Sequence, residues 1–503
     1  MRYEKLIEES FKNILQSAEE ASFEPIVKKT GIISDIGDGI IDVENLDASY
    51  YELLILPHNL EALVLNISKK SIKAVVLGDY TLLNVGDEVE KSGKGISVGV
   101  GYNLLGRIID PLGKPLDERD TPQYELKYPI ESEALPFFKR DFVKEPMYTG
   151  IKIVDAMIPI GKGQRELIIG DSSTGKTSIA IDAIINQYDK DVYCVYVSIG
   201  QKKAQVARII EELQRNEALS HTVVVAATAD DSAGLKFIAP YAGSAIAEFF
   251  RDEGKDVLIV YDDLTKHADS YRMLSLLLQI PPGREAYPGD IFFVHSRLLE
   301  RAGKRDIKYG GGSITALPIV ETQAGKISAY IPTNLISITD GQIYLDRELF
   351  NKGFLPAIDI GKSVSRIGSK AQVPALKKMA SRLKLDYSQF LEVEVFTKFG
   401  AKLEDETMNL IKKGEALRET LKQGRSVRLD MPKQAVTFFL YNNGFLEKLE
   451  IDKISDFVNE FLEYLEISYP DILTLIADTG DMDESTLSTL EKVAAQFFEE
   501  FNK

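Results

Sequence analysis

The chain has 503 residues, of which 44% are hydrophobic and 27% are charged, a balance typical of proteins with packed cores. This length predicts two or three domains, because single cores stop growing at about 250 to 300 residues. Sixty Lys and Arg against 77 Asp and Glu give a net charge of −17, with no large basic block. The charge disfavours a nucleic-acid-coating protein, and it fits either high solubility or a basic partner surface.

Cysteine content and hydropathy bear on the cellular compartment in which the protein works. Cys194 is the only cysteine, so it cannot form an internal disulfide, and in "VYCVYV" we predict a buried strand residue rather than a nucleophile. The pattern suits a reducing compartment. The start "MRYEKLIEESFKNIL" has no apolar signal core, and no stretch approaches the ~20 apolar residues of a membrane span. If the protein works at a membrane, we expect another chain to hold it there.

Residues 1–93 are expected to form a helix followed by a small β-domain. An amphipathic stripe over residues 3–20 predicts an N-terminal helix within 1–23. From 24 to 93, short β-rich runs such as "TGIISDI", "GIIDV" and "AVVLG" alternate with turn pairs such as Asp38-Gly39. This alternation predicts a small antiparallel barrel or sandwich.

Residues 94–371 alternate strands with helices. The expected strands are "ELIIG", "DVYCVYVSI", "TVVVAAT", "DVLIVYDD" and "DIFFVHS", and the helix-period segments include "KTSIAIDAIINQ" and "KAQVARIIEELQRN". Such runs separated by helices predict a multidomain α/β protein whose central parallel sheet is covered on both faces. After Gln372 the strands stop, and apolar stripes such as Ile454–Leu465 predict a helical domain over 372–503.

The segment "GDSSTGKTS" has the form of a phosphate-binding loop, G-x-x-x-x-G-K-[ST], between an expected strand and an expected helix. Its glycines let backbone N–H groups approach phosphate oxygens, Lys176 offers positive charge, and the Thr177 hydroxyl can ligate Mg²⁺. The sequence therefore predicts a site for ATP or ADP with Mg²⁺. The candidate residues of this loop are Gly170, Asp171, Ser172, Ser173, Thr174, Gly175, Lys176, Thr177 and Ser178.

Two residues that follow expected strands bear on what this site does. Asp262 closes "DVLIVYDD", and we expect it to hold Mg²⁺ jointly with Thr177, directly or through water; a turn-capping carboxylate is the alternative. After "VYCVYVSIG", where we expect a catalytic carboxylate, the chain has Gln201. Glutamine has no accessible pKa for general-base work, although some nucleotide hydrolases position water with it. Gln201 therefore favours a site that holds the nucleotide over one that cleaves it.

Arg366 lies in "GKSVSRIGS", just before the helical domain. Spacing alone favours a structural salt bridge. The alternative is a guanidinium that reaches another subunit's phosphates and stabilises charge there.

Longer segments resemble a known family. "TGIKIVDAMIPIGKGQRELIIGDSSTGKTSIAIDAIINQ", "GKDVLIVYDDLTKHADSYRMLSLLLQIPPGREAYPGDIFFVHSRLLERA" and "GKSVSRIGSKAQ" are similar to the alpha subunit of F-type rotary ATPase, and the similarity extends from about Glu24 through the C-terminal helices. The beta subunit is a weaker match, because this chain has Gln201 where beta-like sequences carry the catalytic glutamate.

The resemblance implies a RecA-like P-loop domain within a ring of three alpha-type and three beta-type chains around a central stalk. It also implies a peripheral stalk that links the ring to a membrane complex on its cytoplasmic side. We expect this chain to bind no nucleic acid and not to insert into the membrane itself. By resemblance the alpha-type site holds Mg-nucleotide without turning it over, and catalysis occurs on beta. Arg366 matches the arginine that reaches into that catalytic site, which reverses the interpretation from spacing. Ser337 and Ser363 match positions near the same interface.

Several residues depart from the family pattern. Ser172 and Ser173 replace the Arg and Gln of the usual loop "GDRQTGKT", and Leu355 stands where the base pocket commonly has an arginine. Phe350 and Gln423 are kept, while Arg425 replaces a second glutamine. We therefore expect weaker or less base-selective nucleotide binding than at a usual alpha site, as in a divergent paralogue of an ATP-consuming motor.

Two other functions fit the phosphate-binding loop. One is a catalytic export-type P-loop ATPase homohexamer, against which Gln201 argues. The other is a Rho-like RNA-translocating helicase, which the net charge of −17 and the lack of an evident basic or aromatic RNA face disfavour.

Overall fold

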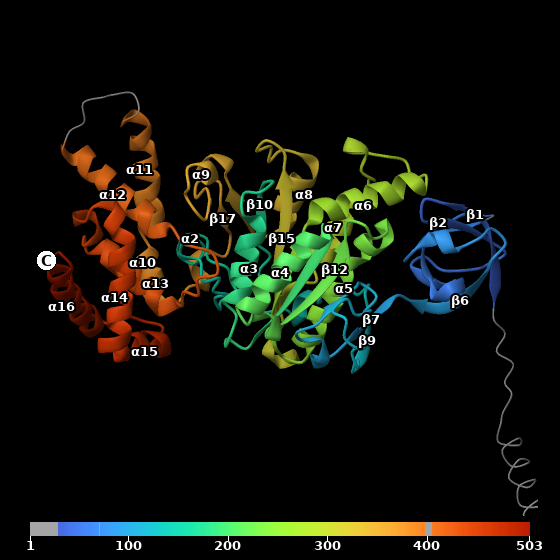
Figure 1. Cartoon of the computed structure of the whole chain (residues 1–503), viewed down its shortest axis with the longest axis horizontal. Coiled ribbons are helices and arrows are strands. Elements are labelled where there is room, and N and C mark those ends of the chain that lie inside the picture. Colours follow the sequence, from blue (N-terminus) through green and yellow to red (C-terminus); the bar gives the residue numbers. More distant parts are fainter. Residues whose placement is uncertain (1–28, 70, 398–404, 503) are drawn as a thin grey trace, which may run out of the picture. The chain divides into compact units, whose positions relative to one another are not determined.

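The computed structural model describes residues 29–69, 71–397 and 405–502, and the chain divides into two compact units, Met1–Lys94 and Gly95–Lys503. Figure 1 colours both along the sequence. The N-terminal helix predicted for residues 3–20 lies outside the described residues. Among the described residues, no helix has the length and hydropathy that a membrane span requires.

The first unit is a closed antiparallel barrel with the strand order β1-β2-β5-β4-β3-β6. The Asp38-Gly39 pair joins β1 to β2 with both φ angles positive, 50° and 83°, as a tight hairpin turn requires. Inward-facing Ile33, Ile41 and Val64 are buried in the barrel core. Of the predicted barrel or sandwich, the barrel is confirmed. Its strands are β1 Thr30–Gly37, β2 Ile40–Glu44, β3 Glu52–Ile55, β4 Glu61–Ile67, β5 Ile72–Val76 and β6 Glu88–Gly95.

The second unit contains a nine-stranded sheet in the order β17-β16-β10-β15-β13-β11-β12-β8, with β14 also paired to β15. Only the short β14 and β17 run antiparallel to their neighbours. A separate two-stranded sheet pairs β7 with β9. The strands are β7 Ser97–Val100, β8 Ile108–Ile109, β9 Leu126–Pro129, β10 Leu167–Asp171, β11 Val192–Gln201, β12 Thr222–Thr228, β13 Asp256–Asp262, β14 Gly303–Lys304, β15 Ser313–Thr322, β16 Gly341–Leu345 and β17 Val364–Ser365.

Helices cover both faces of this sheet. The chain passes from β10 through α3 to β11 and through α4 to β12, and then returns through α5 to β13 and through α6 and α7 toward β15. Because parallel crossovers are right-handed, the reversal places α3 and α4 on the face opposite α5 and α6. The predicted parallel sheet covered on both faces is confirmed. The helices are α2 Lys152–Met157, α3 Lys176–Ile185, α4 Lys203–Arg215, α5 Ala233–Asp252, α6 Leu264–Leu277, α7 Ile291–Leu299, α8 Tyr330–Ile338 and α9 Arg347–Asn351.

One predicted strand is wrong: "DIFFVHS" lies in helix α7. The buried residues Ile291, Val294, His295 and Leu298 follow a helical period, while Phe292 and Phe293 are 38% and 71% exposed. A short apolar run does not by itself separate a strand from a helix, and here the buried spacing decides. β15, which was not among the expected strands, also pairs with β13. It contains Pro318, and a proline within a run argues against a strand.

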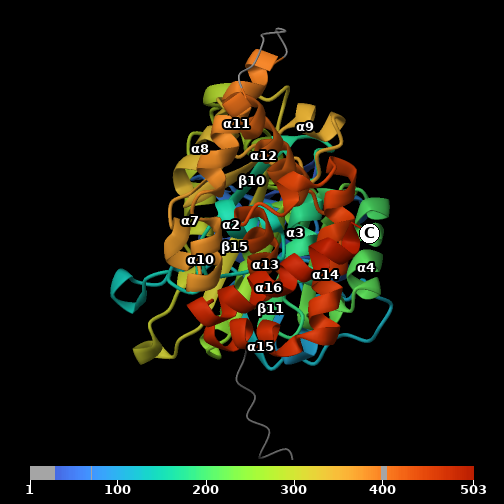
Figure 2. The same ribbon diagram turned by 90° about the vertical axis from the view of Figure 1, so that its left-hand side faces the viewer.

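The C-terminal domain is helical, as predicted, and its helices pack together beside α2 (Figures 1 and 2). The predicted stripe is confirmed, since Ile454, Phe457, Phe461 and Leu465 are buried along α14. The helices are α10 Pro374–Ala380, α11 Leu383–Thr397, α12 Asp405–Leu421, α13 Met431–Asn442, α14 Ile454–Ser468, α15 Pro470–Thr479 and α16 Glu484–Phe501.

Candidate functional site

The phosphate-binding loop lies between the carboxyl end of β10 and the start of α3. Ser173 and Gly175 have φ angles of 62° and 101°, so the chain reverses in the left-handed region before entering the helix. A Cβ on Gly170 would come within 2.7 Å of the Leu345 carbonyl oxygen and 3.0 Å of Thr174 Oγ1, so a larger residue does not fit there. This curled loop at a helix N-terminus is the geometry that binds phosphate.

Lys176 brings a buried positive charge into the loop. Its Nζ donates a hydrogen bond to the Asp171 carbonyl oxygen at 2.6 Å and lies 3.9 Å from Glu321 Oε2. Burial lowers the pKa of Lys176, while the neighbouring carboxylates of Glu321, Asp263 and Asp262 raise it. An ammonium has three donors, so this one retains capacity for an anion in the hollow beside it.

Asp262 is a buried carboxylate held only by neutral groups among the described residues. Thr177 Oγ1 and the Tyr196 hydroxyl donate to its Oδ2 at 2.7 and 2.8 Å, and Gln201 Nε2 donates to its Oδ1 at 2.9 Å. No ion pair in the described part of the chain neutralises it. A hard divalent cation with oxygen ligands fits this uncompensated charge, so Thr177 and Asp262 are suited to hold Mg²⁺.

Gln201 is fixed at both ends of its amide. Its Nε2 donates to Asp262, and its Oε1 accepts from Lys266 Nζ at 2.7 Å. Because a carboxylate only accepts and an ammonium only donates, the amide orientation is determined. Lys266 also pairs with Asp263 Oδ2 at 3.4 Å, and its side chain passes close to Gly200.

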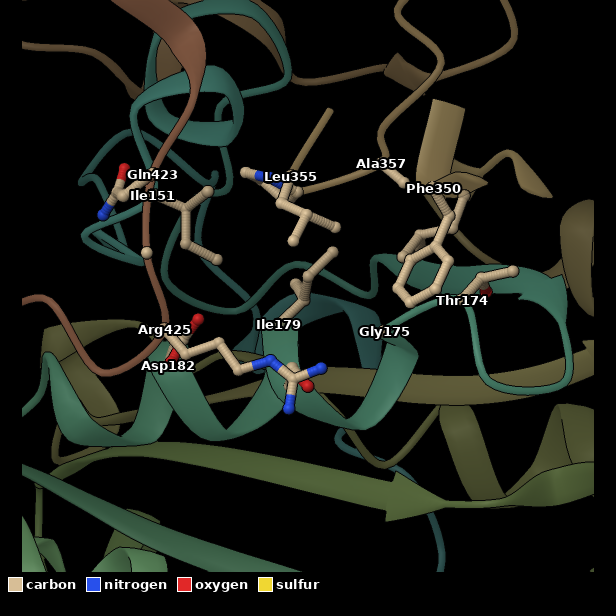
Figure 3. Close-up of a pocket in the computed structure, with 14 residues that line it drawn as sticks. Ile151, Thr174, Gly175, Ile179, Asp182, Phe350, Leu355, Ala357, Gln423 and Arg425 are labelled. Carbon is tan, nitrogen blue, oxygen red and sulfur yellow. The ribbon is translucent and has the colours of Figure 1, made fainter. Parts of the chain in front are cut away.

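Two adjoining hollows meet at the loop. The polar hollow, of about 450 Å³, contains Lys176, Thr177, Gln201, Asp262 and Lys266. The second hollow is mainly apolar (Figure 3) and continues from the first, because Gly175, Ser178, Phe350 and Arg425 line both. A polar compartment for phosphates joined to an apolar one for a base suits a nucleotide.

The apolar hollow is lined mainly by side chains that cannot hydrogen-bond a base, with Ser178, Asp182 and Arg425 as polar exceptions. Ile151, Ile179, Phe350 and Leu355 line it, as labelled in Figure 3. Gln423 uses both amide groups on the backbone: Oε1 accepts from Lys152 N at 2.9 Å, and Nε2 donates to the Gly150 carbonyl at 2.6 Å. In this structure Gln423 therefore holds the wall of the hollow rather than presenting its amide to a ligand.

Arg366 lies far from the loop, at the amino end of the same strands. Ser365 pairs with Gly341 at the start of β16, whereas Gly170 pairs with Leu345 at its end. Four residues of strand correspond to about 13 Å. Arg366 is exposed, and no described side chain forms a hydrogen bond or ion pair with its guanidinium. The salt bridge suggested by spacing is therefore absent from the described part of the chain.

The two serines predicted near the interface differ. Ser337 is exposed on α8, and its hydroxyl donates to the Asn334 carbonyl at 2.7 Å. Ser363 is fully buried: it accepts from Tyr344 N at 2.9 Å and donates to the Asp359 carbonyl at 2.6 Å. These bonds give Ser363 a structural role in the segment before Arg366, so direct contact with a neighbouring chain is not expected of it.

Sequence reasoning missed several residues of the two hollows. Lys266 and Tyr196 contact Gln201 and Asp262, yet only the fold brings their segments together. Asp182 lines the apolar hollow and accepts from Ser426 N at 2.8 Å; burial raises its pKa to about 6. Its position two turns into the helix that follows the loop was a usable signal.

A phosphate-binding loop at the carboxyl end of a doubly wound parallel sheet, followed by a buried acidic strand end, defines a P-loop nucleotide-binding protein. The sequence comparisons specify the class. Residues 150–365 match the nucleotide-binding domain of the ATP synthase alpha/beta family, and residues 372–497 match the C-terminal domain of the ATP synthase alpha/beta chain. The chain belongs to the ATP synthase alpha/beta family.

Its curated relatives include alpha subunits from several bacteria. It is 49% identical to ATP synthase subunit alpha of Caldanaerobacter subterraneus subsp. tengcongensis over 94% of both chains. It is 48% identical to that of Dehalococcoides mccartyi over 93% of both chains. It is 47% identical to that of Petrotoga mobilis over 99% of this chain and 98% of the relative. The resemblance to the alpha subunit of F-type rotary ATPase is thereby confirmed.

Proposed function

We propose that this chain is a non-hydrolysing, regulatory alpha-type subunit of a rotary ATPase ring. It binds Mg-nucleotide at its own loop and supplies Arg366 to the catalytic site of a beta-type neighbour. The alpha-subunit relatives support its place in an ATP synthase complex. We further propose that the ring has three alpha-type and three beta-type chains around a central stalk, and that a peripheral stalk links it to a membrane complex on the cytoplasmic side.

The position of Arg366 carries this proposal. Its guanidinium is exposed and unpaired by any described side chain, about 13 Å of strand away from the loop of its own chain. A planar guanidinium that no described side chain pairs with, next to the edge strand β17, suits charge that develops on another chain's phosphates. Coupling of hydrolysis or synthesis to rotation then requires both chains.

Gln201 supports the non-hydrolysing role. A general base must accept a proton, and a glutamine amide cannot do so at accessible pH. The amide is also bonded to Asp262 and Lys266, so it is not free to orient water. When nucleotide is bound, Lys176 neutralises phosphate charge, while Thr177 and Asp262 hold the Mg²⁺ that joins the phosphates to the protein.

The test is Arg366→Lys in the ring assembled with beta-type chains. Lysine keeps the charge and loses the planar fork, so turnover should fall by two or more orders of magnitude, the scale of arginine fingers (~10³–10⁵). Assembly and nucleotide binding by this chain should persist, measured by sedimentation and equilibrium titration. Near-normal hydrolysis would refute the finger. Hydrolysis by the purified chain alone would favour a catalytic homohexamer, and stimulation by RNA a helicase.

A further inference from the structure

Arg366 is anchored at one end of a row of residues that crosses three strands. Its backbone N donates to the Asp340 carbonyl at 2.9 Å, and Asp340 N donates to the Arg165 carbonyl at 2.8 Å. These residues extend the pairing at the amino edge of the sheet, by one position beyond β17 and β16 and by two beyond β10. The position of the Arg366 backbone therefore depends on the position of Asp340.

Asp340 is fixed on Arg165 by its side chain as well. Its Oδ2 accepts from Arg165 N and Nε, each at 3.0 Å, and its Oδ1 accepts from the guanidinium at 2.9 Å. Arg165 also pairs with Glu300. Both members of the Arg165–Asp340 pair are largely shielded, with side chains 15% and 26% exposed. A bidentate pair of this kind imposes geometry that a single contact does not.

A buried second layer holds the residue before Arg366. Gln164 Nε2 donates to Ser365 Oγ at 3.2 Å and to Glu166 Oε2 at 2.7 Å, while Ser365 Oγ donates to the Pro159 carbonyl at 2.7 Å. Burial raises the pKa of Glu166 well above its usual value, although the charge of Arg366 acts in the opposite direction. The Arg366 guanidinium itself is exposed, and no described side chain bonds it.

We propose that Arg165 and Asp340 are positioning residues that set where the Arg366 guanidinium projects, with Ser365 and Gln164 as their support. This inference rests on the proposed function of Arg366 as an arginine finger. Neither residue touches the nucleotide of its own chain, since neither lines the two hollows. Their effect passes through the strand that carries Arg366, where small displacements of a charged group lower catalysis steeply.

The opposite edge of the same sheet offers a matched control. Beside β8, Arg107 Nε and NH2 donate to the two oxygens of Asp117 at 2.6 and 3.0 Å, and Asp117 also accepts from Ile108 N. This pair has the same chemistry as Arg165–Asp340 and its aspartate is more buried, 6% against 26% exposed, but it lies at the other end of the strand order. Asp117→Asn therefore reports what loss of an edge ion pair does to the fold alone.

The experiment compares Asp340→Asn, Asp117→Asn and Arg366→Lys in the ring assembled with beta-type chains, using steady-state ATP hydrolysis and thermal melting. Asp340→Asn should lower kcat about 10- to 100-fold with KM nearly unchanged. Asp117→Asn should leave kcat within about twofold. In the Arg366→Lys background, Asp340→Asn should cause little further loss, because it acts through the residue already changed.

Normal kcat for Asp340→Asn in an assembled ring would overturn the inference, as would an equal loss in the Arg366→Lys background. If Asp340→Asn prevents assembly, Ser365→Ala is the deciding variant: a several-fold fall in kcat supports the inference, and normal kcat overturns it. Normal turnover in Arg366→Lys alone would instead refute the finger itself, whatever Asp340→Asn does.

Discussion

The two ends of β10 and β16 carry opposite kinds of polar chemistry. At the carboxyl end of the sheet, Lys176, Gln201 and Asp262 are buried around a hollow. Gln201 donates to Asp262, and Lys176 donates to the Asp171 carbonyl. At the amino end, Arg366 is exposed and its guanidinium has no partner among the described side chains. The first site is assembled within one chain, whereas under the proposed function the second is completed by another chain.

Of the proposed substitutions, Lys176→Met should show the largest difference between the roles of the two ends of the sheet. Lys176→Met deletes the buried ammonium, so the affinity of the purified chain for Mg-nucleotide should fall about 100-fold or more, as for loss of charge-assisted hydrogen bonds worth about 3 kcal/mol. Initial turnover of the assembled ring should change far less than in Arg366→Lys. Equilibrium titration and initial-rate assays check this, and equal loss of turnover in both variants would contradict the comparison.

Restoring a carboxylate should not make the loop hydrolytic. In Gln201→Glu the new carboxylate lies where the amide oxygen is now 2.7 Å from Lys266 Nζ, so an ion pair should form and weaken it as a base. Added negative charge beside the phosphates should lower Mg-nucleotide affinity by about 10-fold, on the order of 1 to 2 kcal/mol. Phosphate release by the purified chain should stay at background. Gln201→Glu with Lys266→Met is the matched variant, and clear hydrolysis by the single variant would contradict the proposal.

The apolar hollow should contribute a pH-dependent cost to stability. Burial raises the pKa of Asp182 to about 6, above its ordinary value of 3.8, so the folded state holds the proton more tightly. The free energy of unfolding should therefore fall as pH rises from about 4 to about 6. Asp182→Asn should stabilise the chain by about 1 kcal/mol at pH 7.5 and by less at pH 5. Denaturant titration at both pH values checks this, with Asp478→Asn at an exposed position of α15 as the control variant.

Base selectivity should be the smallest effect. With Gln423 bonded to the backbone and Leu355 in the wall, the polar side chains left to read the edge of a base are Ser178, Asp182 and Arg425. Sites with few such hydrogen bonds discriminate weakly, so the affinities for Mg-ATP and Mg-GTP should lie within about 10-fold. Competitive titration of the purified chain measures the ratio. Tight binding with strong preference for adenine would show that the departures at Ser172, Ser173 and Leu355 are compensated.

Patterns local in the sequence predicted much of the fold. β10, β11, β12 and β13 each lie where an apolar β-branched run predicted a strand, and α14 buries the predicted stripe. The thiol of Cys194 is buried in β11, as expected. The failure at α7 arose because four consecutive apolar residues satisfy both periods, and only the neighbours that bury two of them decide between the two.

The sequence alone determined the phosphate-binding loop, since Gly170, Gly175, Lys176 and Thr177 act through backbone freedom and charge that are local to one turn. It also determined the absence of a carboxylate at Gln201. Only the tertiary structure decided that Lys266 bonds this glutamine and that Arg366 lies at the other end of the strands. Those contacts join segments that are remote along the chain, and sheet order rather than local preference brings them together.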